Sequence, residues 1–168
     1  MSSTRNDITR HALDRFNRDG VESVGIRELA RELGLSPGNL SYHFPKKDDL
    51  VAELARQFRD ANDAVYGRCP VDGSLADFMG LFTALFGNHI RYRFLPISIV
   101  HVFETNSLLK TNYRKVDRRR RELLLERLVA LQRNGDLRVD VGPDELTQVV
   151  ADITLIARFW LSETRLSF

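Results

Sequence analysis

The sequence predicts an all-α protein, made of a three-helix N-terminal unit and a larger helical C-terminal unit. In most segments between turn signals, apolar residues recur three or four positions apart, which is the spacing of one helix face. The sustained alternation of apolar and polar residues that marks a strand is absent, and no Asn-Gly or Asp-Gly pair joins two β-branched runs as a hairpin turn would. Glycine and proline stand mainly where helices would end or begin.

The composition is that of a globular protein. Hydrophobic residues make up 43% and charged residues 29% of the 168 residues, which suits one long or two short domains with a proper core. The one cysteine, Cys69, cannot form an internal disulfide, as expected in a reducing compartment. No apolar run approaches a membrane span, and Met1–Asp7 is too polar for a signal peptide. A cytoplasmic protein is therefore expected.

Two helices are expected before residue 35. The first runs from about Thr4 to Asp19, and Gly20 ends it with a left-handed cap. The second spans Ile26–Leu33 and stops at Gly34, which accepts a backbone conformation that a side chain would resist. The apolar stripe of the first helix consists of Ile8, Ala12, Leu13 and Phe16.

A third, short helix follows immediately. Ser36 is a good N-cap, and Pro37 occupies the first helical position, where a missing N–H costs nothing. The helix reaches Phe44, and Pro45 breaks it. A long fourth helix, Leu50–Tyr66, then leads out of the N-terminal unit.

The C-terminal unit begins after a turn at Pro70–Gly73. Ser74 and Asp77 resemble a capping box and open a fifth helix that reaches Phe86. Pro96 starts or kinks the next segment, which ends near Leu109. The remaining expected elements are a long helix over Asn112–Asn134, a loop over Asn134–Gly142 and a last helix over Leu146–Leu161.

The second and third helices have the spacing of a helix-turn-helix, with a Gly-Leu-Ser turn between them. Leu29 and Ala30 allow close packing, Leu35 fills the corner from inside, and Leu40 and Phe44 anchor the third helix to the core. The residues left near the outer surface are Ser36, Gly38, Asn39, Ser41, Tyr42 and His43. Spacing alone also allows a different interpretation, a tight helical corner inside a core.

A helix of this kind fits the major groove of B-DNA, which is about 12 Å wide. Asn39 would read adenine through paired hydrogen bonds, and Ser41 and Tyr42 would touch phosphates or a thymine methyl group. Gly38 has no side chain and would let the helix N-terminus approach the DNA, where its backbone N–H groups favour phosphate. Residues 1–60 carry ten Lys or Arg and ten Asp or Glu, so DNA affinity would depend on where the positive groups lie.

The run from Gly20 to Leu50 resembles the TetR (tetracycline repressor) family of bacterial transcription regulators. The residues that meet the family pattern are Leu29, Ala30, Gly34, Leu35, Ser36, Gly38, Leu40, His43, Phe44, Lys47 and Leu50. The residues that the resemblance implies at the DNA surface are Arg27, Ser36, Gly38, Asn39, Tyr42, His43 and Lys47. Lys47 would be the family's phosphate-contacting lysine. The chain departs from the pattern at Ser41, where the family has Tyr, and at Gly25, where it has a Ser or Thr N-cap.

The resemblance also implies that the middle helices bind a small molecule and that the last helices form a dimer. The C-terminal unit has an aromatic stripe at Phe78, Phe82 and Phe86, and an apolar ligand pocket needs such walls with a few polar groups. The residues predicted to line a pocket for a small hydrophobic or aromatic effector are Phe82, Phe86, His89, Tyr92, His101, Phe103 and Trp160. The alternative is that the stripe is ordinary core.

Two further features of the C-terminal unit support predictions. The basic run Arg118–Arg121 is interpreted as a solvent-exposed face with local ion pairs to Glu122 and Glu126, rather than a second DNA or partner surface. The last helix has an apolar face too wide for one neighbour, which predicts packing on a partner subunit in a homodimer. That face consists of Leu146, Val149, Val150, Ile153, Ile156, Ala157 and Trp160. The bundle is either minimal or continued by a helix beyond Phe168.

No phosphate-binding glycine loop, metal-ligand cluster or catalytic constellation is present in the sequence, so an enzyme, a metal and a cofactor are not expected. The sequence predicts a DNA-binding domain over 1–50 and a ligand-sensing and dimerisation domain over 51–168. Together they would form a ligand-responsive regulator, a repressor that binds a palindromic operator in duplex DNA as a dimer. The alternative function is a helical small-molecule-binding or interaction module whose head has lost DNA binding.

Overall fold

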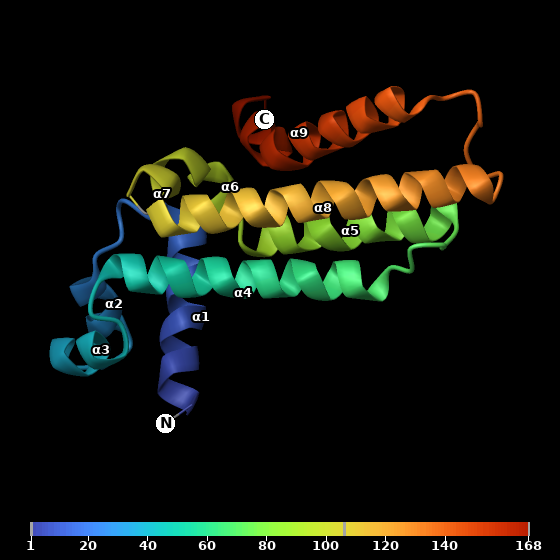
Figure 1. Ribbon diagram of the computed structural model, residues 1–168. Helices are drawn as coiled ribbons and strands as arrows, with labels where there is room; N and C mark the ends of the chain where they lie inside the picture. The colour runs from blue at the N-terminus through green and yellow to red at the C-terminus, as the bar shows by residue number, and fades with distance from the viewer. Residues whose placement is uncertain (1, 106, 168) are drawn as a thin grey trace.

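The computed structural model describes residues 2–105 and 107–167, with side chains over 4–104 and 109–164. Within these residues the chain is helical throughout, with turns between the helices and no strand. The helices are α1 (Ser2–Asp19), α2 (Ile26–Glu32), α3 (Pro37–His43), α4 (Lys47–Arg68), α5 (Leu75–Arg91), α6 (Phe94–Ile97), α7 (Ile99–Thr105), α8 (Ser107–Arg133) and α9 (Pro143–Ser167). Figure 1 shows α1, α2 and α3 as a head at one end of a long helical body.

The head has the predicted helix boundaries to within about two residues. Gly20 ends α1 with φ +83°, and Gly34 ends α2 with φ +66°, both in the left-handed region that disfavours a side chain. The Ser36 side chain caps α3 by accepting the Asn39 N–H at 3.1 Å, and Pro37 occupies its first position. Gly25 precedes α2 without a side-chain cap. The local sequence signals therefore determine this part of the backbone.

Helix α4 begins earlier than the sequence predicts, at Lys47 rather than Leu50. Its first turn holds Asp48 and Asp49, and the Asp49 carboxylate accepts the Lys46 N–H at 2.9 Å. The helix then runs without interruption from the head into the body (Figure 1). It is the structural element that joins the two predicted units.

The body is a bundle in which α4, α5 and α8 lie side by side and α9 lies along α8 (Figure 1). The predicted capping box at the start of α5 is confirmed, because Ser74 and Asp77 exchange hydrogen bonds. The segment expected to begin near Pro96 is instead two short helices, α6 and α7, separated at Ser98. Helices α8 and α9 are both longer than predicted.

Two hydrophobic cores fill the structure. The head core contains Ile8, Phe16, Leu29, Leu40 and Phe44, all nearly inaccessible to solvent. Residues from elsewhere complete it, namely Leu50, Val51 and Leu54 of α4 with Tyr92, Phe94, Leu95 and Val102 from the α5–α7 region. The second core lies between α4, α5, α8 and α9. Packing is therefore continuous across the predicted domain boundary at residue 50.

Buried polar groups fix the far end of the bundle. The Arg127 guanidinium of α8 is 4% exposed and donates to the carbonyl oxygens of Tyr66 and Cys69, at 3.1 and 2.6 Å. These carbonyls lie at the C-terminus of α4, where a cation also suits the helix dipole. Asn88 of α5 donates to the buried Asn62 of α4 at 2.9 Å. Both contacts set the register of α4 against its neighbours.

None of the helices in the described part of the chain combines the length and the apolar character needed to cross a membrane.

Candidate functional site

Helix α3 presents one face to solvent. Ser36, Gly38, Asn39 and Ser41 are exposed, and Tyr42 is 77% exposed. The opposite face carries Leu40 and Phe44, each 1% exposed, in the head core. Half-buried His43 stacks edge-on against Tyr42, with 5.2 Å between ring centroids. The structure therefore brings the residues predicted for α3 to one surface, with exposed Arg27 on the neighbouring α2.

A residue that the sequence analysis missed holds the end of α3. The Arg5 guanidinium donates to the carbonyl oxygen of His43 at 2.9 Å and lies 4.2 Å above the centre of the Phe44 ring. It also pairs with Glu53 of α4 at 3.5 Å. Arg5 therefore ties α3 to α1 and α4. No local signal indicates this contact, because Arg5 and His43 are 38 residues apart.

The acidic side chains of α2 are hydrogen-bonded to α1. Arg15 donates to Glu28 at 2.7 Å and to Glu32, and His11 contacts Glu32 at 2.7 Å. These hydrogen bonds from Arg15 hold the pKa of both carboxyl groups below the ordinary value. Among the described residues Arg27 has no salt-bridge partner, and it is exposed. The formally neutral head therefore still has cationic groups at its surface.

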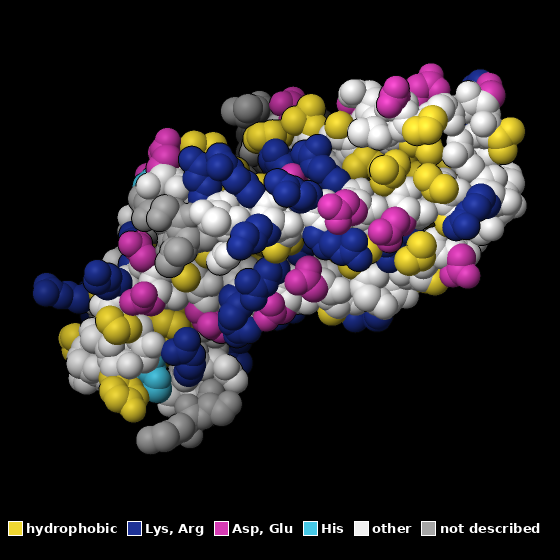
Figure 2. All heavy atoms as spheres, viewed as in Figure 1, with side chains coloured by type: hydrophobic (Ala, Val, Ile, Leu, Met, Phe, Trp, Pro, Cys, Tyr) yellow, Lys and Arg dark blue, Asp and Glu magenta, His cyan; other side chains and the backbone are white. Residues whose placement is uncertain are grey.

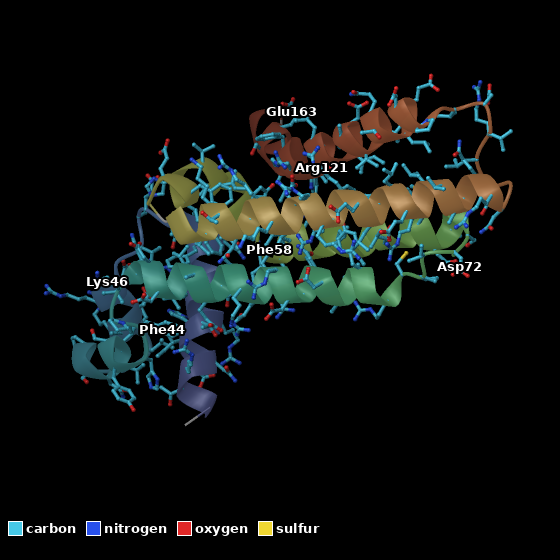
Figure 3. The ribbon with its side chains drawn as sticks, in the orientation of Figure 1. Phe44, Lys46, Phe58, Asp72, Arg121 and Glu163 are labelled. Carbon is cyan, nitrogen blue, oxygen red and sulfur yellow. The ribbon has the colours of Figure 1, made fainter. Side chains whose placement is uncertain are left out.

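Lys47 lies at the start of α4, as the resemblance implies, but its side chain is hydrogen-bonded within the head. Its ammonium group is half-buried and donates to the carbonyl oxygens of Val21, Glu22 and Val24, at 2.9, 3.3 and 3.3 Å. A lysine has three N–H donors, so in this geometry none is left for a phosphate. Lys47 instead fastens the loop between α1 and α2 to the start of α4. The neighbouring Lys46, labelled in Figure 3 beside the head, is exposed and forms no ion pair with the described residues.

A cavity of about 530 Å³ lies in the body, lined by residues of α4, α5, α6, α7, α8 and α9. Three of the predicted pocket residues line it, namely Phe82, His89 and Phe103. Its size is within the range of small-molecule sites. Residues of α4 from Asp49 to Tyr66 form one of its walls.

The other four predicted pocket residues, Phe86, Tyr92, His101 and Trp160, do not line this cavity. Phe86 packs on Trp160 instead, with 5.1 Å between their ring centroids. Tyr92 is 3% exposed in the head core, and exposed His101 pairs with Glu22 at 3.3 Å. Helical spacing identifies residues that share a face, but it does not say which neighbouring helix covers that face.

Apart from His89, the polar residues of the cavity were not predicted. Asp117 of α8 accepts hydrogen bonds from Arg121 Nε at 3.0 Å and from an Nη of Arg158 on α9 at 2.9 Å. The Arg158 guanidinium also lies 5.4 Å from the centre of the Tyr113 ring. All four side chains line the cavity. The sequence signal that could have indicated them is the run Arg118–Arg121, because α8 packs against neighbouring helices and some of these arginines must therefore point inward.

The interpretation of that run as a solvent-exposed face is correct for only half of it. Arg118 and Arg119 are exposed, and Arg119 pairs with Glu122 and Glu126 as predicted. Arg120 and Arg121 are half-buried and line the cavity. Consecutive residues on a helix point in directions about 100° apart, so four in a row cannot all face solvent on a packed helix.

His89 is a neutral polar group in the cavity wall. Burial and the positive charge of Arg120 lower its pKa to about 4. Its Nδ1 accepts the Trp160 indole N–H at 3.4 Å, as a neutral ring can. Trp160 therefore lies directly behind a cavity residue.

Comparison with known proteins identifies the family. A family model described as "Bacterial regulatory proteins, tetR family" matches residues 8–54, which contain the helix-turn-helix. A second model, "Bacterial transcriptional repressor", matches residues 50–167, well over half of the chain. The chain belongs to the TetR family of DNA-binding transcriptional regulators. The predicted fold class, an N-terminal helix-turn-helix head with a helical C-terminal domain, is confirmed.

Curated TetR-family relatives match with modest identity. The transcriptional repressor KstR2 of Mycobacterium tuberculosis is 34% identical over 89 residues, which are 51% of this chain and only 44% of that protein. KstR2 of Mycolicibacterium smegmatis is 25% identical over 95% of this chain and 80% of that protein. The transcriptional regulator UidR of Escherichia coli is 23% identical over 90% and 78%.

Solved structures show the same fold. A TetR-family regulator from Marinobacter aquaeolei superposes with a TM-score of 0.90 at 23% identity, over 96% of this chain and 80% of that one. KstR2 of Mycobacterium tuberculosis superposes with a TM-score of 0.74 at 23% identity, over 95% and 84%.

The two neighbouring lysines should have separable effects. Lys46→Ala should weaken binding to all DNA sequences alike and reduce the salt slope of the affinity by about one, because it removes one exposed cation. Lys47→Ala should lower the free energy of unfolding by about 1–3 kcal/mol, because it leaves loop carbonyls without donors. Fluorescence anisotropy at several salt concentrations measures the DNA affinity, and urea unfolding measures the stability. Arg133→Ala, at an exposed position, is the control. A Lys47→Ala variant of unchanged stability and reduced salt slope would contradict this assignment.

His89 should make the protein less stable in mild acid. Its folded-state pKa lies below the unfolded value near 6.5, so the unfolded chain takes up the proton first as the pH falls. Stability is therefore lost between about pH 6.5 and pH 4, by up to about 2 kcal/mol at pH 5. Urea unfolding of wild type and His89→Gln at pH 7.5 and pH 5 measures the difference. Identical pH dependence in the two proteins would refute this prediction.

Proposed function

We propose that the protein is a dimeric, ligand-responsive repressor that binds a palindromic operator through two copies of α3 and releases it when a small molecule occupies the cavity. One observation carries the proposal. Helix α4 begins beside α3, contributes Leu50 and Leu54 to the head core, and forms a wall of the cavity with residues such as Phe58. A ligand against that wall acts on the same rigid element that positions the head.

The operator contacts follow from the exposure of α3. Asn39 is exposed at the helix N-terminus, where its amide would pair with an adenine edge in the major groove. Tyr42, Ser41 and His43 would touch the DNA backbone or a thymine methyl group, and Gly38 would allow close approach of the helix. Ser36 contributes as the N-cap, since its hydroxyl is engaged with the Asn39 N–H. Arg27 and Lys46 would neutralise phosphates, with Lys47 acting through the loop that it holds.

The dimer would use the outer face of α9. Of the face predicted from the sequence, Leu146 and Val150 are buried inside the protomer, Ile153 and Ala157 line the cavity, and Trp160 packs on Phe86. Among the α9 side chains that the structure describes, the large apolar residues that remain exposed are Val149, Leu155, Ile156 and Phe159, with exposed fractions between 39% and 61%. A stripe of this kind fits a two-fold partner helix.

The two functions would then belong to successive parts of the chain. Residues 1–50 bind DNA, and residues 51–168 sense the ligand and form the dimer. This boundary is functional rather than structural, because α4 and the head core cross it.

Base recognition by Asn39 should be measurable. Asn39→Ala should reduce the discrimination between the operator and a single-base variant by about 1–3 kcal/mol while leaving non-specific affinity nearly unchanged. A gel-shift titration with DNA from upstream of the protein's own gene, at two salt concentrations, provides the measurement, with Asn134→Ala as control. Absence of sequence-selective binding by wild type at low salt would overturn the proposal and favour the alternative, a sensor module whose head no longer binds DNA.

The proposed dimer face should be sensitive to a buried charge. Ile156→Glu should convert a micromolar dimer to a monomer, because an unpaired carboxylate would be desolvated at the interface. Light scattering over a concentration series measures the mass, with Val139→Glu as control, since Val139 is 80% exposed in the loop before α9. A wild-type monomer at micromolar concentration, or an Ile156→Glu dimer, would show that this face does not carry the interface.

A further inference from the structure

The cavity combines aromatic walls with an excess of positive charge. Phe58, Phe82 and Phe103 are among its aromatic lining residues. Its charged lining residues are five arginines, Arg56, Arg59, Arg120, Arg121 and Arg158, against two aspartates, Asp49 and Asp117. Figure 2 shows Lys and Arg side chains gathered over the middle of α4 and α8 and between α8 and α9. These arginine side chains are partly exposed, and Arg120 and Arg158 are the least exposed, at 21% and 25%.

The arginines of α8 and α9 outnumber their acceptors. Arg121 and Arg158 share the single carboxylate of Asp117, and Arg120 donates to Asp63 at 2.8 Å. Nε of Arg120 and Nε of Arg158 are buried, and neither has a hydrogen-bond acceptor among the described residues. Both nitrogens are covered by protein atoms, so an anionic group in the cavity would meet the terminal Nη groups of these arginines instead.

The arginines of α4 are already compensated. Arg56 is paired with Glu53 and Asp60, and Arg59 is paired with Asp60. The two acidic lining residues are also engaged, since Asp49 accepts the Lys46 N–H and Asp117 accepts from two arginines. Next to α8 and α9 the lining therefore has one carboxylate, that of Asp117, and Arg121 and Arg158 offer more donors than it accepts.

The aromatic and cationic parts of the cavity adjoin. The Tyr113 ring lies 4.8 Å from the Phe103 ring, between centroids, and 5.4 Å from the Arg158 guanidinium. In Figure 3, Arg121 projects from the side of α8 that faces α9, and Phe58 lies on the side of α4 that faces α8. A ligand that reaches Arg121 and Arg158 with one group can therefore place an apolar body against Tyr113 and Phe103.

We propose that the cavity takes an apolar or aromatic molecule bearing one anionic group, which Arg121 and Arg158 bind. Arginine suits this role because its planar fork matches an oxyanion with two parallel hydrogen bonds. Asp117 holds the two guanidinium groups in place between α8 and α9 before the ligand arrives. This inference rests on the proposed function, in which the cavity is the effector site.

A matched pair of fluorescent probes tests the charge preference. Anilinonaphthalene sulfonate carries an anion on two ring systems, and N-phenyl-naphthylamine has the same rings without the sulfonate. Titration of the full-length protein should give a dissociation constant at least about tenfold lower for the sulfonate. Equal affinities, tighter binding of the neutral probe, or no binding of either probe would overturn the proposal.

Variants locate the anion site. Arg121→Gln and Arg158→Gln should each weaken sulfonate binding about tenfold and leave the neutral probe unchanged. Asp117→Asn should strengthen sulfonate binding, because it removes the competing negative charge while its amide oxygen can still accept a hydrogen bond from a guanidinium group. A damaged fold would not produce that gain. Arg119→Gln, an exposed neighbour on α8, should change neither affinity. Sulfonate binding that is insensitive to Arg121→Gln, Arg158→Gln and Asp117→Asn would place the anion elsewhere and refute the assignment.

A parallel measurement separates this inference from the proposed function. Operator DNA bound to the protein is titrated with dodecanoate, which is anionic, or with dodecanol, which has the same chain length and no charge. Each compound is kept below the concentration at which it aggregates, and release of the DNA is measured. Release by dodecanoate that is lost in Arg158→Gln supports both proposals. Arginine-dependent sulfonate binding without any release supports the ligand class and contradicts the regulation. Equal release by dodecanol and dodecanoate supports the regulation and contradicts the ligand class.

Discussion

The packing of one uninterrupted helix into two cores is the constraint on which the rest of this structure depends. Leu50 and Leu54 of α4 are fully buried in the head core, whereas Val65 and Tyr66 are buried in the core of the body. Close-packed cores transmit displacement rather than absorbing it. The orientation of the head is therefore set by how α4 lies in the bundle, and the cavity lies against that same helix.

Charged groups also fix the segments around this helix. Lys47 fastens the α1–α2 loop to its start, Arg5 ties the end of α3 to it through Glu53, and Arg127 binds the carbonyls at its far end. Arg15 draws the carboxylates of α2 toward α1. Because these charges are used inside the protomer, the formal net charge of the head says little about the surface it presents to DNA.

Local structure in the head was predictable because its signals lie within a few residues of each other. Gly20, Gly34, Ser36 and Pro37 act on their own backbone, and the helices end where these residues require. The cavity was predicted less well, since only Phe82, His89 and Phe103 of the seven proposed residues line it. Its lining comes from six helices, and the apolar periodicity of a helix face does not indicate which other helix covers that face.

The sequence by itself determined the all-α fold class, the helix-turn-helix and its capping, because short-range sterics and hydrogen bonding specify them. The motif residues also resembled the pattern of the TetR family. Only the tertiary structure decided that Lys47 binds loop carbonyls, that Arg120 and Arg121 face a cavity while Arg118 and Arg119 do not, and which apolar residues of α9 stay exposed. These outcomes depend on side chains far apart in the chain. The packing of the helices decides which side chains meet, and a local sequence pattern does not contain that information.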